Sequence, residues 1–421
     1  MRIYARRPAH PRYSSPGGNP MTAPRRVVIV GTGIAGITAA ETLRSKGFDG
    51  HITVYGAEPE LPYHRAALSK DLLDADLSPQ GVALGDADFW ANRRIKVVTG
   101  TSVVNVRPGH RSVVIDTGAE VPYDALILAT GGVARRPHWM RPDVDVLRTR
   151  RDAVAIQSAM RGQDTLIIVG GGLIGLELAS AAVEAGKRVT LLEATDQILG
   201  DTLPAPLADH LADLHRSRGV DLLTHATVTN ATPDHVDGDG FDTPSRGHVI
   251  VAVGAGPNTK LAKCSGARSR NTGIRTDGNL RTSVRGVYAA GDVAQTPHPI
   301  TGLPCGGGHW LTAREQGKAV AMTVLADLGF DVEPGVPPIP VARSEQYGVD
   351  IQIVGWPHSG DRLEVTGSLD GFDATIRVYD GFQMVGAVGF GDHADCFALR
   401  DELEQTIVPL SIPAAGIGMV G

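Results

Sequence analysis

A glycine-rich turn between a buried strand and a helix occurs twice in this chain and constrains the fold more than any other feature. The first copy, Gly31-Thr32-Gly33-Ile34-Ala35-Gly36, follows the apolar run 27–30. The second copy, Gly170-Gly171-Gly172-Leu173-Ile174-Gly175, follows the apolar run 166–169. In such a turn the first glycine permits a sharp bend, the second lets a pyrophosphate approach the backbone, and the third lets the helix pack on the strand. The free N–H groups at the helix N-terminus then favour phosphate.

The pattern around each turn predicts an α/β unit that binds a dinucleotide. In the first unit we expect a strand at 25–30, a helix at 34–46 and a strand at 51–55; in the second, a strand and helix in 164–186 and a strand at 188–192. Further buried strands are expected at 126–132, 249–253 and 287–292. Two dinucleotides in one chain are typical of a flavoprotein that takes electrons from a nicotinamide nucleotide.

Composition along the chain predicts a tail, two dinucleotide-binding domains and a third domain. A basic stretch with Pro, Gly and Ser at 1–24 is expected to be a disordered tail, or to precede a true start at Met21. The first domain is expected to be discontinuous, at 25–140 and 267–330, and the second to occupy 141–266. After a Pro-rich linker at 334–340, a C-terminal α+β domain is expected at 335–421. Its expected elements are strands at 350–356, 362–369, 373–379 and 383–388 and a short helix at 395–405.

Bulk composition limits the class of function. The formal net charge of −6 disfavours a nucleic-acid partner, and no apolar run reaches the roughly 18 residues that span a membrane. Cys264, Cys305 and Cys396 are too far apart in sequence for a CxxC motif. A disulfide framework, an iron–sulfur cluster or another metal site within the chain is therefore not expected. The cytoplasm is the expected location.

An acidic residue near the end of the second strand of each unit is expected to bond a ribose hydroxyl. In the second unit this residue is Glu193, whose carboxylate would repel a 2′-phosphate, so NADH is expected over NADPH. In the first unit the candidate is Glu58. The alternative for each is a solvated acid at a strand end.

Several short motifs further along the chain carry a family resemblance. They are Leu68-Ser69-Lys70, Ala129-Thr130-Gly131-Gly132, Ala290-Gly291-Asp292 and Ser344-Glu345-Gln346-Tyr347, together with Gly170–Glu177. With them the chain resembles the FAD-dependent, NADH-using ferredoxin reductases of oxygenase systems, the putidaredoxin reductase and biphenyl dioxygenase reductase group. The resemblance extends from about residue 25 to about residue 400. It implies a glutathione-reductase-like fold, with FAD in the first domain, NADH in the second and a third domain at the interface.

The resemblance also implies roles for single residues. Lys70 and Glu177 would pair beside flavin N5 and order the hydride path; the alternative for Glu177 is an acid that stabilises a helix start. Asp292 would bind the ribityl chain, and a helix starting at His309 would direct its positive end at the flavin pyrimidine. The other implied cofactor contacts are Ala35, Arg65, Val103, Ala129, Thr130, Gly131, Arg148, Gly254 and Trp310.

The chain departs from the family pattern at two positions. Leu173 stands where an aromatic residue usually stacks on the flavin, which predicts a more open nicotinamide pocket. Arg343 stands where a tryptophan often precedes Ser344, and it is a candidate contact for an acidic ferredoxin. Six arginines between residues 135 and 151 form a basic stretch expected to meet cofactor phosphates or to steer the partner. The alternative for all of these arginines is a solvated linker.

The sequence therefore predicts an oxidoreductase that passes electrons from NADH through FAD to an iron–sulfur ferredoxin. That ferredoxin would serve a cytochrome P450 or a Rieske-type oxygenase. A rubredoxin reductase or an NADH oxidase of the same fold is the nearer alternative, and acceptor assays separate them. A flavin-dependent, redox-responsive binding protein is the alternative from another class, marked by slow flavin reduction coupled to a change in oligomeric state.

Overall fold

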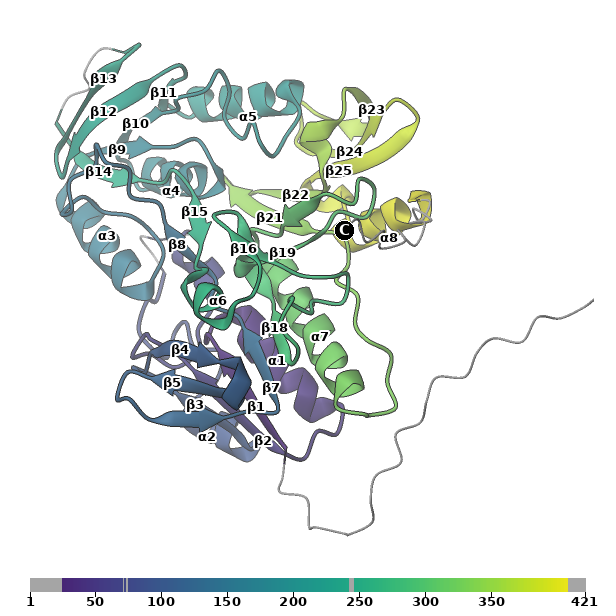
Figure 1. The fold of residues 1–421 in the computed structure, drawn as a ribbon. Helices are drawn as coiled ribbons and strands as arrows, with labels where there is room; N and C mark the ends of the chain where they lie inside the picture. The colour runs from purple at the N-terminus through teal and green to yellow at the C-terminus, as the bar shows by residue number, and fades with distance from the viewer. Residues whose placement is uncertain (1–24, 71, 73–74, 242–245, 408–421) are drawn as a thin grey trace, which may run out of the picture.

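The structure is a computed structural model, and it describes residues 25–70, 72, 75–241 and 246–407. The predicted tail at 1–24 and the segment 408–421 lie outside the described residues. Figure 1 shows the first unit at the bottom, around β1 and β7, and the second unit at the top left, around β9 and β10. The C-terminal strands and the helix α8 lie at the right.

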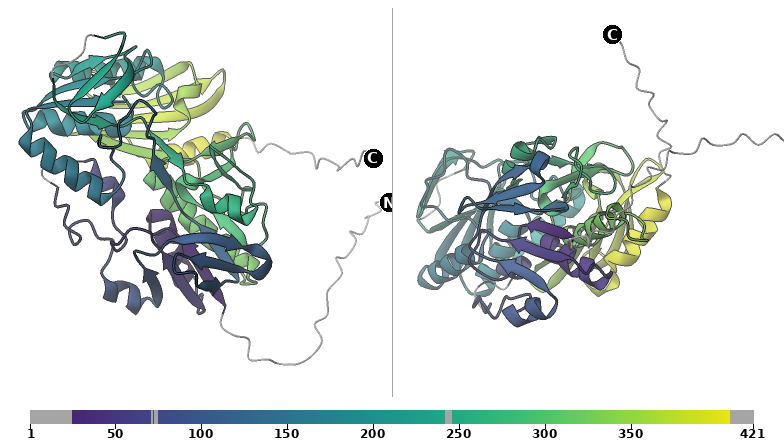
Figure 2. Two further views of the ribbon diagram at one scale, coloured as in Figure 1. Left: turned by 60° about the vertical axis from the view of Figure 1, so that its left-hand side comes forward. Right: turned by 60° about the horizontal axis from the view of Figure 1, so that its bottom comes forward.

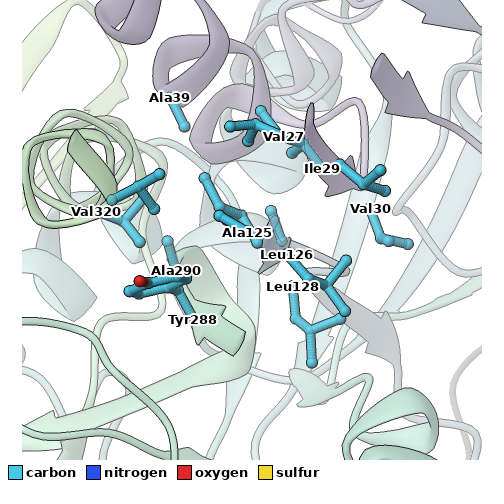
Figure 3. Close-up of a cluster of buried hydrophobic side chains, with 14 of the residues drawn as sticks. Val27, Ile29, Val30, Ala39, Ala125, Leu126, Leu128, Tyr288, Ala290 and Val320 are labelled. Atoms are coloured by element: carbon cyan, nitrogen blue, oxygen red, sulfur yellow. The ribbon is translucent and has the colours of Figure 1, made fainter. Parts of the chain in front are cut away.

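The first unit is built on a five-stranded parallel sheet with the order β18-β7-β1-β2-β3. Its strands read as nearly continuous apolar runs because both faces are covered. Figure 3 shows Val27, Leu126 and Tyr288 of this sheet in one buried cluster with Ala39 of α1 and Val320 of α7. The bounds are β1 Arg26–Val30, α1 Ile34–Ser45, β2 His51–Tyr55, α2 Ala87–Asn92, β3 Ile95–Val98, β7 Ala125–Leu128, β18 Val287–Ala289 and α7 Trp310–Asp327.

The second unit repeats this plan with a four-stranded parallel sheet in the order β11-β10-β9-β14. A hairpin of β12 and β13 follows β11 and forms a separate two-stranded antiparallel sheet. The bounds are α3 Arg150–Gly162, β9 Thr165–Val169, α4 Leu173–Glu184, β10 Arg188–Leu192, α5 Ala205–Ser217, β11 Asp221–Leu223, β12 Thr227–Thr232, β13 His235–Asp239 and β14 His248–Val251.

Short strands occupy the connections between these units. β8 and β15 pair antiparallel where the chain enters and leaves the second unit. β4, β5 and β6 form a small antiparallel sheet that packs on the first unit. The bounds are β4 Val103–Arg107, β5 Ser112–Ile115, β6 Glu120–Pro122, β8 Gly132–Ala134, β15 Ala255–Pro257, α6 Lys260–Ser265, β16 Ser269–Arg270, β17 Gly273–Arg275, β19 Ala294–Pro297 and β20 Pro304–Gly306.

The C-terminal part is a five-stranded antiparallel sheet in the order β21-β22-β25-β24-β23, with α8 beside it. The left view of Figure 2 shows its yellow strands beside the teal second unit, and the two parts share one buried apolar cluster. The bounds are β21 Val341–Gln346, β22 Val349–Gly355, β23 Arg362–Ser368, β24 Asp373–Asp380, β25 Gln383–Phe390 and α8 Cys396–Thr406.

The structure confirms the predicted α/β class and most of the predicted elements. Three predicted strands are too long, and the one expected at 249–253 ends at Val251. The strand expected at 126–132 ends at Leu128, because Gly131 has a left-handed φ of 64° and separates β7 from β8. The strand expected at 287–292 ends at Ala289, because Gly291 has a φ of 78° and begins a 3-10 turn. Both breaks occur at the carboxyl end of the first sheet.

We expect Gly36→Ala to destabilise the first unit by about 3 kcal/mol, because overpacking forces the backbone to move. A Cβ at Gly36 would stand 2.1 Å from the carbonyl oxygen of Gly31, whereas a Cβ at Gly33 would meet no atom within 4 Å. Gly33→Ala is therefore the matched control, with a free energy of unfolding close to that of wild type. Denaturant unfolding measures both variants, and equal values would contradict the packing described here.

Candidate functional site

The two glycine-rich turns open into one continuous cleft of about 1880 Å³. Sites for one small ligand measure roughly 300–1,000 Å³, so this cleft has room for more than one such molecule. Its wall runs from the first turn to the second. The start of α7 adds His309 and Trp310 to this wall, and β21 of the C-terminal sheet adds Arg343. All the predicted site residues line it except Gly36 and Gly175, which lie behind their turns.

The geometry of both turns fits a bound pyrophosphate. Gly31 and Gly170 have left-handed φ values of 121° and 116°, and a Cβ at either would meet a backbone carbonyl of the neighbouring strand end. Gly33 and Gly172 cap α1 and α4 without any side-chain hydrogen bond, and each faces open space where a Cβ would stand. The first N–H groups of both helices are therefore free of side-chain caps and available to an anion.

Both strand-end acids are held by neighbouring groups. Glu58 accepts hydrogen bonds from the hydroxyl of Tyr63 at 2.6 Å and from Nη2 of Arg65 at 2.7 Å. Glu193 accepts from the N–H of Gly171 at 2.7 Å and from the backbone and hydroxyl of Thr195 at 2.9 and 2.8 Å. Glu193 is thus tied to the second turn itself. The next acids along the cleft wall are Asp196 and Asp201.

Three residues that the family resemblance singled out lie together in the first half of the cleft. Nη2 of Arg148 lies 2.9 Å from Oδ2 of Asp292, and its Nε donates to the carbonyl of Gly132 at 3.0 Å. Nη1 of Arg65 donates to the carbonyl of Arg148 at 2.6 Å. Asp292 is thus a partly exposed carboxylate, fixed from one side and open to the cleft.

Glu177 has two serine partners that the sequence analysis missed. The hydroxyl of Ser69 bonds Oε2, and the hydroxyl of Ser344 donates to Oε1 at 2.7 Å. Burial raises the pKa of Glu177, and the two hydroxyls, the positive charge of Lys70 and the backbone of Glu345 oppose that rise. Lys70 thus acts on Glu177 as a nearby charge, while the hydrogen bonds come from serines. Both serines lie in motifs quoted above, but neither motif shows that they meet one carboxylate.

The N-terminus of α7 faces the same region of the cleft. His309 caps α7, where its Nδ1 accepts from the N–H of Leu311, and its Nε2 lies 3.1–3.2 Å from the backbone of Arg343. Burial lowers the pKa of His309 to about 4, so its ring is neutral at pH 7 and the helix end supplies the positive potential. Next to it, the buried Nε1 of Trp310 has no hydrogen-bond partner among the described residues, so it can donate to a group bound in the cleft.

Half of the six arginines in the basic stretch are paired with acidic side chains of the chain itself. Arg141 lies 3.3 Å from Asp143, and Arg150 lies 3.0 Å from Glu60. With Arg148 held by Asp292, these side chains carry less free charge than the sequence indicates. Arg343 is likewise held, by Asp350 at 2.5 Å, although half of its side chain is exposed.

All three cysteines are free thiols, and none of them lines the cleft. In residues 25–407, apart from the few positions left undescribed, no group of three His, Cys, Asp or Glu side chains is placed to hold a metal ion. Within the same part of the chain, no helix combines the length and apolar character that crossing a membrane requires.

Comparison with known proteins identifies the family. The family model for pyridine nucleotide-disulphide oxidoreductases matches residues 25–317. A ferredoxin–NAD(P)+ reductase of a Sphingomonas species is 34% identical over 351 residues, covering 81% of this chain and 83% of the relative. The ferredoxin–NAD+ reductase subunit of the benzene 1,2-dioxygenase system of Pseudomonas putida is 32% identical, covering 91% and 93%.

A solved structure agrees with these relatives. The ferredoxin reductase for the CYP199A2 system of Rhodopseudomonas palustris superposes with a TM-score of 0.84 at 25% identity, covering 91% of this chain and 96% of that one. Proteins of this family use FAD and NAD(P)H, and the turns, Asp292 and α7 described above fit both nucleotides. The chain belongs to the pyridine nucleotide-disulphide oxidoreductase family and, within it, to the FAD-dependent ferredoxin reductases of oxygenase systems.

Proposed function

We propose that this chain transfers electrons from NADH, through bound FAD, to an iron–sulfur ferredoxin that serves a P450 or Rieske-type oxygenase in the cytoplasm. The observation that carries the proposal is the single cleft into which both phosphate-binding turns open. When bound, FAD supplies the chemistry, since it accepts a hydride from a two-electron donor and releases electrons singly. The named activities of the relatives agree with this use of the cleft.

The first half of the cleft holds the FAD in this proposal. The free N–H groups of α1 bind the pyrophosphate, and Glu58, already oriented by Tyr63 and Arg65, accepts from the adenosine ribose. Asp292 accepts from ribityl hydroxyls on its open side. The positive end of α7 stabilises negative charge on the flavin pyrimidine, and the neutral His309 cap leaves that end unshielded by an anion.

The second half of the cleft holds the NADH. The N–H groups of α4 bind its pyrophosphate, and Glu193 accepts from its adenosine ribose. Glu177 lies in the first turns of α4 and accepts from the nicotinamide carboxamide, with Lys70 as the nearby positive charge. Leu173 and the exposed Ile174 add apolar side chains to the wall of this half of the cleft, which stays more open than it would with an aromatic residue at 173. No cysteine is present in the cleft to divert electrons to a disulfide substrate.

The half-exposed Arg343 is our candidate contact for an acidic ferredoxin. It lies at the cleft wall and its backbone bonds His309, so a partner docked there would be close to the flavin end of α7. Because Asp350 neutralises part of its charge, we expect this contact to contribute to orientation more than to long-range steering.

An acceptor assay tests the proposal directly. The purified flavin-containing protein should reduce [2Fe–2S] ferredoxins with NADH, followed optically under anaerobic conditions, because the cleft offers electrons to a docked one-electron acceptor. Reduction of rubredoxin but of no ferredoxin would support the rubredoxin reductase alternative. Rapid NADH consumption with oxygen as the only competent acceptor would instead make the protein an NADH oxidase.

Glu193→Arg should shift the ratio of kcat/KM for NADPH over NADH by roughly 10–100-fold, because a charge-assisted hydrogen bond replaces repulsion of the 2′-phosphate. Glu193→Gln is the matched control, since it keeps an acceptor for the Gly171 N–H and should give an intermediate ratio. An unchanged ratio in Glu193→Arg would remove Glu193 from cofactor selection.

Asp292→Ala should weaken FAD retention by roughly 10–100-fold, because charged hydrogen bonds to the ribityl chain are lost and Arg148 loses its partner. Asp143→Ala, which removes the partner of Arg141 outside the cleft, is the control and should retain FAD as wild type does. Fluorescence of released flavin on dilution measures both. Equal retention in the two variants would contradict the role of Asp292.

A further inference from the structure

A line of buried polar side chains runs from Glu177 into the contact between the second unit and the C-terminal sheet. Ser344 and Gln346 lie on β21, where alternate residues face the same side, and both are buried. Beyond them lies His215, in the last turn of α5 and 0% exposed. Tyr347 completes the line from the turn after β21.

Each neighbouring pair in this line is hydrogen-bonded. The hydroxyl of Tyr347 lies 3.0 Å from Nδ1 of His215, and Nε2 of His215 lies 2.9 Å from Oε1 of Gln346. Nε2 of Gln346 donates to Oγ of Ser344 at 3.2 Å. Oγ of Ser344 then donates to Oε1 of Glu177 at 2.7 Å. Four hydrogen bonds therefore connect the carboxylate in the cleft to a tyrosine on the turn.

The chemistry of these groups sets the direction of every bond. Oε1 of Gln346 can only accept, so the facing Nε2 of His215 carries the hydrogen and its Nδ1 must accept from Tyr347. The amide NH2 of Gln346 consequently points at Ser344, whose own hydrogen is left free to go to Glu177. If the amide were reversed, Ser344 would donate to Gln346, and Glu177 would lose that hydrogen bond.

Tyr347 occupies its position at a conformational cost. It has a left-handed φ of 52° and, with Gly348 at 75°, forms the two-residue turn between β21 and β22. Asparagine or glycine is the usual residue at such a position. The bond of the tyrosine hydroxyl to His215 accounts for the side chain found there, while the backbone N–H of Tyr347 donates to Oγ of Ser180 at 2.7 Å.

Few charges act on this line. Lys70 is the charge that faces Glu177, while Glu184 and Arg218 act on Tyr347 from α4 and from the end of α5. Burial lowers the pKa of His215 to about 4 and its bond to Gln346 opposes that change, so the ring is neutral at pH 7. The series of hydrogen bonds from Tyr347 to Glu177 requires such a neutral ring, with its one N–H hydrogen on Nε2 of His215.

We propose that His215 is a positioning residue, which fixes the Gln346 amide so that Ser344 donates to Glu177 and favours the ionised form of that carboxylate. This inference rests on the proposed function in one respect: that function identifies the nicotinamide carboxamide as the group that Glu177 contacts. Hydrogen bonds that all run in one direction polarise one another. The bond from Tyr347 to His215 therefore also stabilises the negative charge on Glu177.

The test is the titration of Glu177 in the flavin-containing protein, observed by infrared spectroscopy as the C=O band of a protonated carboxylic acid. Subtraction of the Glu177→Gln spectrum assigns the band. His215→Leu should raise the midpoint of this titration by about one pH unit, because one hydrogen bond to a charged group is lost. Tyr347→Phe, which keeps the ring, should raise it by a smaller amount.

His210→Leu is the matched control. His210 lies on the same helix and bonds the carbonyl of Leu369 in the C-terminal part at 2.8 Å, but it has no connection to Glu177. The control should cost stability at the same contact between the two parts and leave the Glu177 midpoint unchanged. The pH dependence of flavin reduction by NADH should shift in His215→Leu in parallel with the infrared midpoint.

An unshifted midpoint in both His215→Leu and Tyr347→Phe overturns the proposal, as does an equal shift in His210→Leu. If His215→Leu does not fold, Tyr347→Phe decides by the same criterion. Failure of the proposed function would look different, because a protein that reduces no ferredoxin can still show the infrared shift.

Discussion

The structure depends on a contact in which a helix touches the turn that follows its own strand, through a residue with no side chain. Gly36 lies against the carbonyl of Gly31, and Gly175 lies against the carbonyl of Gly170, so closely that a Cβ would stand 2.0–2.1 Å from oxygen. This contact brings the start of each helix over the end of its strand. The uncapped N–H groups of α1 and α4 then face one cleft, which is why two nucleotides can meet there.

The chemistry of the cleft comes from residues that are distant in sequence. Glu177 lies on α4, while its hydroxyl partners lie on the segment after Arg65–Leu68 and on β21. The environment of this carboxylate is therefore complete only when the two nucleotide-binding units and the C-terminal sheet are packed together. We infer that stability of this packing and reactivity toward nicotinamide are linked through Ser344.

Sequence reasoning predicted the parts of the fold that local physics specifies. The strands at His51–Tyr55 and Arg188–Leu192 have the expected bounds, because apolar runs between glycines leave few alternatives. The same reasoning placed the two glycine-rich turns, which the structure brings to one cleft, since glycine spacing defines the turn. It overextended two strands at Gly131 and Gly291, because sequence does not show which glycine adopts a positive φ.

The side-chain partners could not be predicted in the same way. Nothing in the sequence indicates that Glu58 is shared by Tyr63 and Arg65, or that Arg148 neutralises Asp292. These pairs depend on how loops cross the ends of the sheet, which hydrophobic periodicity does not encode. The family resemblance identified Lys70 and Glu177 as neighbours, yet the serines that bond Glu177 emerged only from the structure.

The most direct test of this account is equilibrium binding of NAD+ to the purified protein with its FAD in place, measured by calorimetry with flavin absorbance followed in parallel. The account predicts one NAD+ site per chain, with the flavin retained and its spectrum perturbed, because each turn holds its own pyrophosphate. Displacement of FAD by NAD+, with one nucleotide bound per chain, would contradict it.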